Sequence, residues 1–130
     1  MPVTINASPT NGLVQTADGS GIMKLQSNGV TTNALAWVNF NGTGTVAIRS
    51  SYNVSSITDN GTGDYTVNFT NAMADANYAV VGGSGNGGSF SFVTPNAGTK
   101  TTTSTQIYTT ASSLVSLGDP STVCIAVFGN

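Results

Sequence analysis

The chain of 130 residues is short enough for one domain, or for a small β-arm followed by one domain. Only 6% of its residues are charged, where soluble domains have about a quarter. Its cations are Lys24, Arg49 and Lys100, which are too few for nucleic-acid binding. The sequence has no apolar run of about 18 residues, so membrane insertion is not predicted. It has no His and no Glu, which excludes Ser-His-Asp catalysis, Cys-His catalysis and imidazole metal ligands. We expect a protein without enzymatic activity and without a cofactor.

The N-terminal part of the sequence has a different pattern from the rest. Asn11-Gly12, Asp18-Gly19 and Asn28-Gly29 interrupt short β-prone segments. We therefore predict an extended β-arm or attachment segment over residues 1–30, followed by a β-sandwich head domain over residues 31–130.

The middle of the chain predicts two antiparallel hairpins. Segments 36–40 and 45–49 are separated by Asn41-Gly42-Thr43-Gly44, and Asn-Gly turns favour hairpins because both residues tolerate positive φ. A similar turn over 59–64 joins segments 54–57 and 65–70. The fold class predicted is all-β, an antiparallel β-sandwich or meander.

The Asp pair of the second turn has three interpretations. Asp59 and Asp64 could flank a scissile bond, or contribute oxygen ligands for Ca²⁺. Asp at turn ends more often caps backbone amides, and two carboxylates are few for Ca²⁺. We predict a capping role, no catalytic residues and no metal site.

Two segments, 78–81 and 123–128, are apolar on both faces, as in strands at the centre of a sandwich or at a subunit interface. Cys124 is then expected as a small buried residue of a core strand. Period-two alternation predicts that seven side chains are buried while Thr66 and Asn68 face the opposite side. The seven are Val46, Ile48, Val67, Phe69, Val80, Ile125 and Val127.

The run 82–88, GGSGNGG, is expected to be a flexible loop, and its likeness to a dinucleotide-binding fingerprint fails because no helix follows. A glycine-rich loop on a rigid scaffold can adapt to an irregular ligand. Ser84, Asn86 and Tyr108 are the candidate receptor-binding residues, the tyrosine by stacking on a sugar or an apolar side chain. The only tryptophan, Trp37, is expected in the core or at an interface.

Large aliphatic and Phe side chains are scarce, which leaves a lone monomer with a small core. Packing strands against copies of the chain would add apolar burial. We predict a homotrimer, intertwined or side by side.

One long stretch resembles a known module. Residues 36–69, AWVNFNGTGTVAIRSSYNVSSITDNGTGDYTVNF, together with MADANY at 73–78, are similar to a C-terminal module that recurs in tail-fibre-like proteins of bacteriophages and prophages. The resemblance implies a β-rich, usually trimeric domain near the end of a virion appendage. Family members often sit at the end of a long fibre, whereas this module begins about 35 residues after a Met.

Two functions follow as expectations. The first is a tail-fibre or tail-tip subunit of the virion that binds a host-surface glycan or protein and contacts other virion proteins. The alternative is a capsid decoration or head-fibre protein with no obligatory receptor. An enzyme such as a depolymerase is disfavoured because His, Glu and a clustered carboxylate pair are missing.

Overall fold

The computed structural model describes residues 24–86, 89–111 and 116–129, and the greater part of the predicted arm lies outside them. The described residues form eleven strands and one short 3-10 helix, with no α-helix. The strands are β1 (Gln26–Ser27), β2 (Val30–Thr31), β3 (Ala36–Asn41), β4 (Ala47–Tyr52), β5 (Val54–Gly61), β6 (Asp64–Phe69), β7 (Ala79–Asn86), β8 (Ser89–Ser91), β9 (Val93–Pro95), β10 (Ser104–Thr109) and β11 (Thr122–Phe128), and the helix is η1 (Ala97–Thr99).

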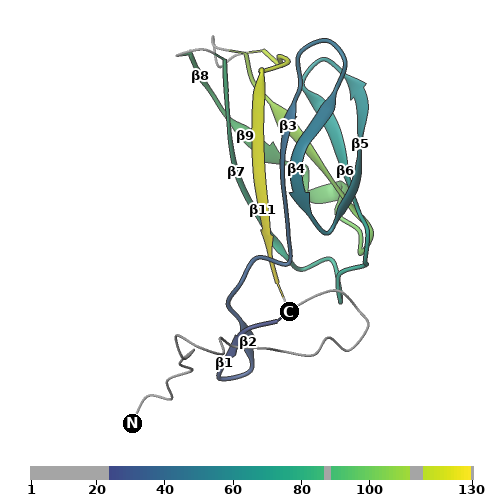
Figure 1. Ribbon diagram of the computed structural model, residues 1–130, viewed down its shortest axis with the longest axis vertical. Coiled ribbons are helices and arrows are strands. Elements are labelled where there is room, and N and C mark those ends of the chain that lie inside the picture. Colours follow the sequence, from purple (N-terminus) through teal and green to yellow (C-terminus); the bar gives the residue numbers. More distant parts are fainter. Residues whose placement is uncertain (1–23, 87–88, 112–115, 130) are drawn as a thin grey trace, which may run out of the picture.

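Two antiparallel sheets make up the body of the molecule (Figure 1). One sheet has five strands in the order β4-β3-β11-β7-β8, and the other has four in the order β5-β6-β10-β9. The predicted all-β, antiparallel fold class is confirmed, in its sandwich form. A separate two-stranded hairpin, β1-β2, lies at the end of the sandwich where β11 finishes (Figure 1).

The two predicted Asn-Gly hairpins both form, but in different sheets. β3 pairs with β4 in the five-stranded sheet, and β5 pairs with β6 in the four-stranded sheet. The chain crosses between the sheets at Asn53, which has a positive φ of 55° and is buried. Its side-chain NH₂ donates to the carbonyls of Leu35 (3.1 Å) and Asn71 (3.2 Å), and its Oδ1 accepts from the Asn71 N–H (2.8 Å). Asn53 therefore fixes the crossover that makes two layers out of one run of hairpins.

The core lies between the sheets and follows the period-two pattern. In β6 the side chains of Tyr65, Val67 and Phe69 are buried, and those of Thr66 and Asn68 are on the other face, as predicted. The core consists of Leu35, Ala36, Val38, Phe40, Val54, Tyr65, Val67, Phe69, Met73, Tyr78, Ile107, Val123, Ile125 and Val127. Both sheets contribute side chains to it, so removing one sheet would expose the other.

Of the seven side chains predicted to be buried, Val67, Phe69, Ile125 and Val127 are buried. Val46 and Val80 are partly buried at the edge of the core. The prediction was wrong for Ile48, whose side chain is 37% exposed. Ile48 belongs to the edge strand β4, and the register between β3 and β4 shifts at Asn39/Phe40. Such a bulge increases the local twist and turns the strand away from the core. The alternation of residues in the sequence does not reveal a bulge.

The predicted loop over 82–88 was wrong for residues 82–86. β7 continues to Asn86 and pairs with β11 and β8. A Cβ on Gly82 would lie 2.5 Å from the Cys124 carbonyl oxygen and 2.8 Å from Ile125 Cγ2, whereas a Cβ on Gly83 would meet nothing within 4 Å. Glycine at 82 therefore permits close approach to β11, and composition alone had suggested flexibility instead.

Tyr65 has its ring in the core and its hydroxyl in a polar cluster at one end of the sandwich. The hydroxyl lies 2.8 Å from Asp119 Oδ1 and 3.2 Å from the Gly42 carbonyl, and Asp119 Oδ1 also accepts from the Gly63 N–H at 2.6 Å. Burial, and secondly the hydrogen bond and negative charge of Asp119, raise the pKa of Tyr65 well above its ordinary value. Tyr65 therefore joins the β3-β4 turn to the segment before β11.

Candidate functional site

The outer surface of the four-stranded sheet is polar along its whole width. We call it the polar face and define it by the outward side chains Ser56, Thr58, Asn60, Asp64, Thr66, Asn68, Thr94, Asn96, Gln106 and Tyr108. These residues alternate with core residues such as Val67 and Ile107, so the strand period that builds the core also builds this face.

Hydrogen bonds between side chains connect the polar face across its strands. Asn60 Nδ2 donates to Asp64 Oδ1 at 3.1 Å, and Gln106 Nε2 donates to the same oxygen at 2.6 Å. Asn96 Nδ2 lies 3.0 Å from Gln106 Oε1 and 3.2 Å from the Tyr108 hydroxyl oxygen. These contacts hold the side chains in fixed positions, so a ligand would meet an arrangement that is already ordered.

Asp64 and Tyr108 are the residues of this network with groups that can still form hydrogen bonds to a ligand. They are direct partners in the β6-β10 register, so their side chains project side by side from the same face. The Tyr108 oxygen accepts from Asn96, which leaves its own O–H proton to donate outward. Both described hydrogen bonds to the Asp64 carboxylate end on Oδ1, so Oδ2 can accept from a ligand. A donor and an acceptor next to one ring suit adjacent hydroxyls on a sugar.

The three predicted receptor-binding residues are not brought together in one site. Tyr108 is half-buried on the polar face, in β10. Ser84 and Asn86 belong to β7 of the other sheet, where Ser84 is half-buried and its hydroxyl lies 2.6 Å from that of Ser91. Asn86 is exposed at the strand end and accepts from the Ser121 N–H at 3.4 Å. Asp64 belongs beside Tyr108, a pairing that its position at the end of a turn in the sequence does not indicate.

The two Asp residues of the second hairpin, Asp59 and Asp64, have different roles. Asp59 Oδ1 accepts from the Gly61 N–H at 3.0 Å, as a capping residue does. Asp64 instead bonds to side chains of the polar face. Within the described ranges no group of three or more His, Cys, Asp or Glu side chains could hold a metal ion.

The outer surface of the five-stranded sheet has an apolar centre, in contrast to the polar face. We call it the apolar face and define it by Trp37, Val81, Gly83, Cys124, Ala126 and Phe128, which belong to the adjacent strands β3, β11 and β7. Trp37 is 39% exposed, Val81 52% and Phe128 36%. The prediction of a buried Cys124 was wrong, and of the two positions expected for Trp37, core or interface, the core is excluded, because both residues point away from the partner sheet. Period-two alternation cannot tell which of two apolar faces meets the other sheet.

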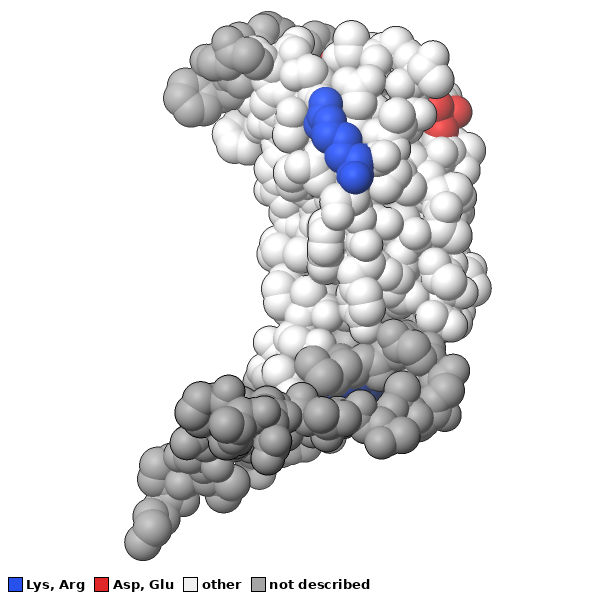
Figure 2. Space-filling model, viewed as in Figure 1, with Lys and Arg blue, Asp and Glu red and all other residues white. Residues whose placement is uncertain are grey.

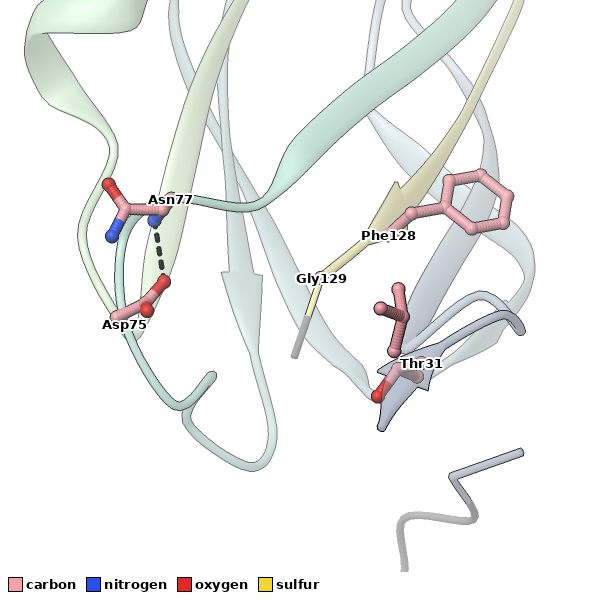
Figure 3. Close-up of a pocket in the computed structure, with 6 residues that line it drawn as sticks. Thr31, Asp75, Asn77, Phe128 and Gly129 are labelled. Carbon is pink, nitrogen blue, oxygen red and sulfur yellow. Dashed lines mark hydrogen bonds between the residues drawn. The ribbon is translucent and has the colours of Figure 1, made fainter. Parts of the chain in front are cut away.

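A shallow pocket of about 300 Å³ opens at the end of the sandwich beside the β1-β2 hairpin. Figure 3 shows Asp75 and Asn77 on one side of it, and Thr31, Phe128 and Gly129 on the other. The Asp75 carboxylate accepts from the Asn77 N–H at 2.7 Å, a local turn contact. The pocket is wide open and offers few convergent polar groups, unlike most small-molecule sites.

The described part of the chain contains no helix long and apolar enough to cross a membrane. Comparison of the chain with protein-family models, with curated proteins and with solved structures finds no match.

Proposed function

We propose that this chain is a structural protein of a bacteriophage virion, a tail-fibre or tail-tip subunit that binds a glycan or protein on the host surface. The observation that carries the binding role is the ordered polar face with Asp64 and Tyr108 in register. Two further features support it: a β-sandwich with hardly any charge, and the resemblance of residues 36–69 and 73–78 to tail-fibre-like modules.

The polar face suits a neutral glycan better than a charged ligand. Its side chains are amides, hydroxyls and one carboxylate, which donate to and accept from sugar hydroxyls. The Tyr108 ring adds a surface on which a sugar can stack. With few charges nearby, such binding depends little on salt. Single contacts of this kind are weak, and a particle with many copies converts them into avidity.

Asn86 and Ser84 have different places in this proposal. Asn86 is exposed at the end of the five-stranded sheet and remains a candidate for a second contact with the host. Ser84 is half-buried against Ser91, so we assign it the role of holding β8 to β7.

The test uses phage particles that carry variants of this chain. Tyr108→Ala removes both ring and hydroxyl, Tyr108→Phe removes the hydroxyl alone, and Asn86→Ala tests the sheet end. Ser50→Ala is the control, because Ser50 is exposed on β4 of the five-stranded sheet, outside the polar face. We expect Tyr108→Ala to slow adsorption to host cells by about tenfold, the effect of losing about 1.4 kcal/mol of binding. Ser50→Ala should adsorb normally.

Particle assembly is checked first, by incorporation of each variant into virions. If fully assembled Tyr108→Ala and Asn86→Ala particles adsorb at the rate of the parent, the receptor proposal fails. That result would favour the capsid decoration or head-fibre alternative.

A further inference from the structure

We propose that the apolar face is the surface through which the chain associates with a second copy of itself. This inference concerns a different surface from the receptor contact and does not depend on the bacteriophage assignment.

The face has the composition of an interface core. Trp37, Ala126 and Val81 lie side by side in one row across β3, β11 and β7, because each is the direct register partner of the next. Phe128 is further along β11. Interface cores are enriched in aromatic residues and depleted of charge, and isolated proteins seldom leave such a row in water.

The charge of the face is compatible with a copy of the same chain as the partner. Arg49 is the one charged residue in the five strands of this sheet. Its side chain lies on the outer surface of the sheet beside the apolar face, because its guanidinium donates to Asn39 Oδ1 at 3.2 Å, to Thr122 Oγ1 at 3.4 Å and to the Ser121 carbonyl at 2.5 Å. Figure 2 shows blue running across the upper middle of this side of the molecule and a small red patch at its right edge, with the rest of the described surface white. A partner selected by charge would need several charges on this face, whereas two copies bring one cation each, and that cation already has acceptors within its own chain.

The size of the face is adequate for self-association. The apolar face is the centre of the outer surface of the five-stranded sheet, which covers about 400–600 Å² because its strands are spaced at about 4.8 Å and all but the short β8 are six to eight residues long. A standard interface takes about 800 Å² from each partner, so this face with its rim approaches that size. Face-to-face packing of two sheets is also a common arrangement of β-structure.

The small residues on the face leave room for a partner's side chains. Gly83 and Cys124 are register partners beside the row of Trp37 and Val81. A Cβ on Gly83 would point into open space, so the hollow above this glycine belongs to the surface of the single chain. An aromatic side chain of the second copy can enter it.

The same geometry provides a sharp test. Gly83→Lys places a charge on the face without steric conflict inside the chain, since nothing lies within 4 Å of the new Cβ and the φ of Gly83 is not positive. Thr94→Lys is the matched control, because Thr94 is exposed on β9, a strand of the opposite sheet. Val81→Thr, nearly the same shape, is a second variant that weakens the face without adding charge.

Two natural probes lie on the face itself. Trp37 is the only tryptophan and Cys124 the only cysteine of the chain. The purified chain is examined from about 1 to about 100 µM, the range of modest affinities. Measurements are the mass by light scattering, the Trp37 emission maximum and the rate at which a thiol reagent labels Cys124, each relative to the same variant when dilute.

At high concentration we expect a mass at least twice that of the monomer, a blue shift of Trp37 emission, and Cys124 labelling slowed about tenfold when about nine tenths of the chains are assembled. Thr94→Lys should behave in the same way. Gly83→Lys, with its unfolding curve unchanged, should stay monomeric with fast labelling, and Val81→Thr should need more protein to assemble.

A wild-type chain that stays monomeric at about 100 µM overturns the proposal. So does an assembly in which Cys124 keeps its dilute labelling rate, or one that Thr94→Lys breaks as effectively as Gly83→Lys. Adsorption of particles plays no part in these measurements, so failure here and failure of the proposed function are distinguishable.

Discussion

Two adjacent glycines of β7 should respond to the same substitution in opposite ways. Gly82→Ala would place a methyl group 2.5 Å from the Cys124 carbonyl oxygen and 2.8 Å from Ile125 Cγ2, both closer than real Cβ contacts. The oxygen belongs to the backbone of the central strand β11, so a rotamer change cannot relieve the contact. Gly83→Ala would place its methyl group in open space.

The magnitudes follow from two opposing effects. Replacing Gly by Ala reduces the freedom of the unfolded chain and stabilises a compatible site by about 0.4–1 kcal/mol. Forcing a methyl group into a filled site costs about 1–3 kcal/mol. We therefore expect Gly82→Ala to lower the free energy of unfolding by about 1–2 kcal/mol, and Gly83→Ala to leave it unchanged or raise it by about 0.5 kcal/mol.

Urea unfolding of the dilute chain measures both variants, with the midpoint compared at equal slope so that a change reports stability alone. In thermal unfolding, a loss of about 1 kcal/mol should lower Tm by about 4 °C for a chain of this size. Equal effects of the two substitutions would refute the reasoning, because only the position of Cβ relative to β11 distinguishes them. A stabilised Gly82→Ala would show that β7 does not approach β11 so closely.

Other substitutions test the crossover, the polar cluster and the core. Asn53→Ala should destabilise the fold by about 3 kcal/mol or more in urea unfolding. The substitution loses a side chain suited to positive φ and leaves three backbone groups without their hydrogen-bond partners. A loss of stability below about 1 kcal/mol would contradict this role of Asn53. The raised pKa of Tyr65 means that the unfolded chain loses this proton first. The contribution of Tyr65 to the free energy of unfolding is therefore complete below about pH 10 and is lost as the pH rises above that value. Tyr65→Phe should be less stable at neutral pH yet show a shallower loss above about pH 10 in unfolding curves, and an unchanged alkaline slope would count against the assignment. Phe40→Ala, which empties a fully buried site in edge contact with the Tyr65 ring, should cost about 3–5 kcal/mol.

The sequence determined the fold class and the hairpins. Alternation in segments such as 65–70 depends on the period of a strand, and Asn-Gly turns depend on local φ preferences, so neither requires knowledge of distant residues. The same local logic correctly placed Val67 and Phe69 inside and Thr66 and Asn68 outside.

Only the tertiary structure decided which apolar face is covered. Segment 123–128 is apolar on both sides, and the chain's crossover at Asn53 determines which side meets the second sheet. Cys124 consequently lies outside, against its prediction as a core residue, and Trp37 lies outside the core as well. Gly82 was taken for part of a loop because the need for glycine arises from β11, forty residues later in the chain.

The candidate site shows the same division. The polar residues around Tyr108 in the sequence were enough to make it a candidate. Its pairing with Asp64 arises from the register of β6 with β10. Its separation from Ser84 and Asn86 arises because those residues belong to the other sheet. Residues close in space across a sandwich are set by strand order and register, which are long-range properties. Local sequence patterns determine which side chains alternate along a strand, and tertiary packing decides which of them meet.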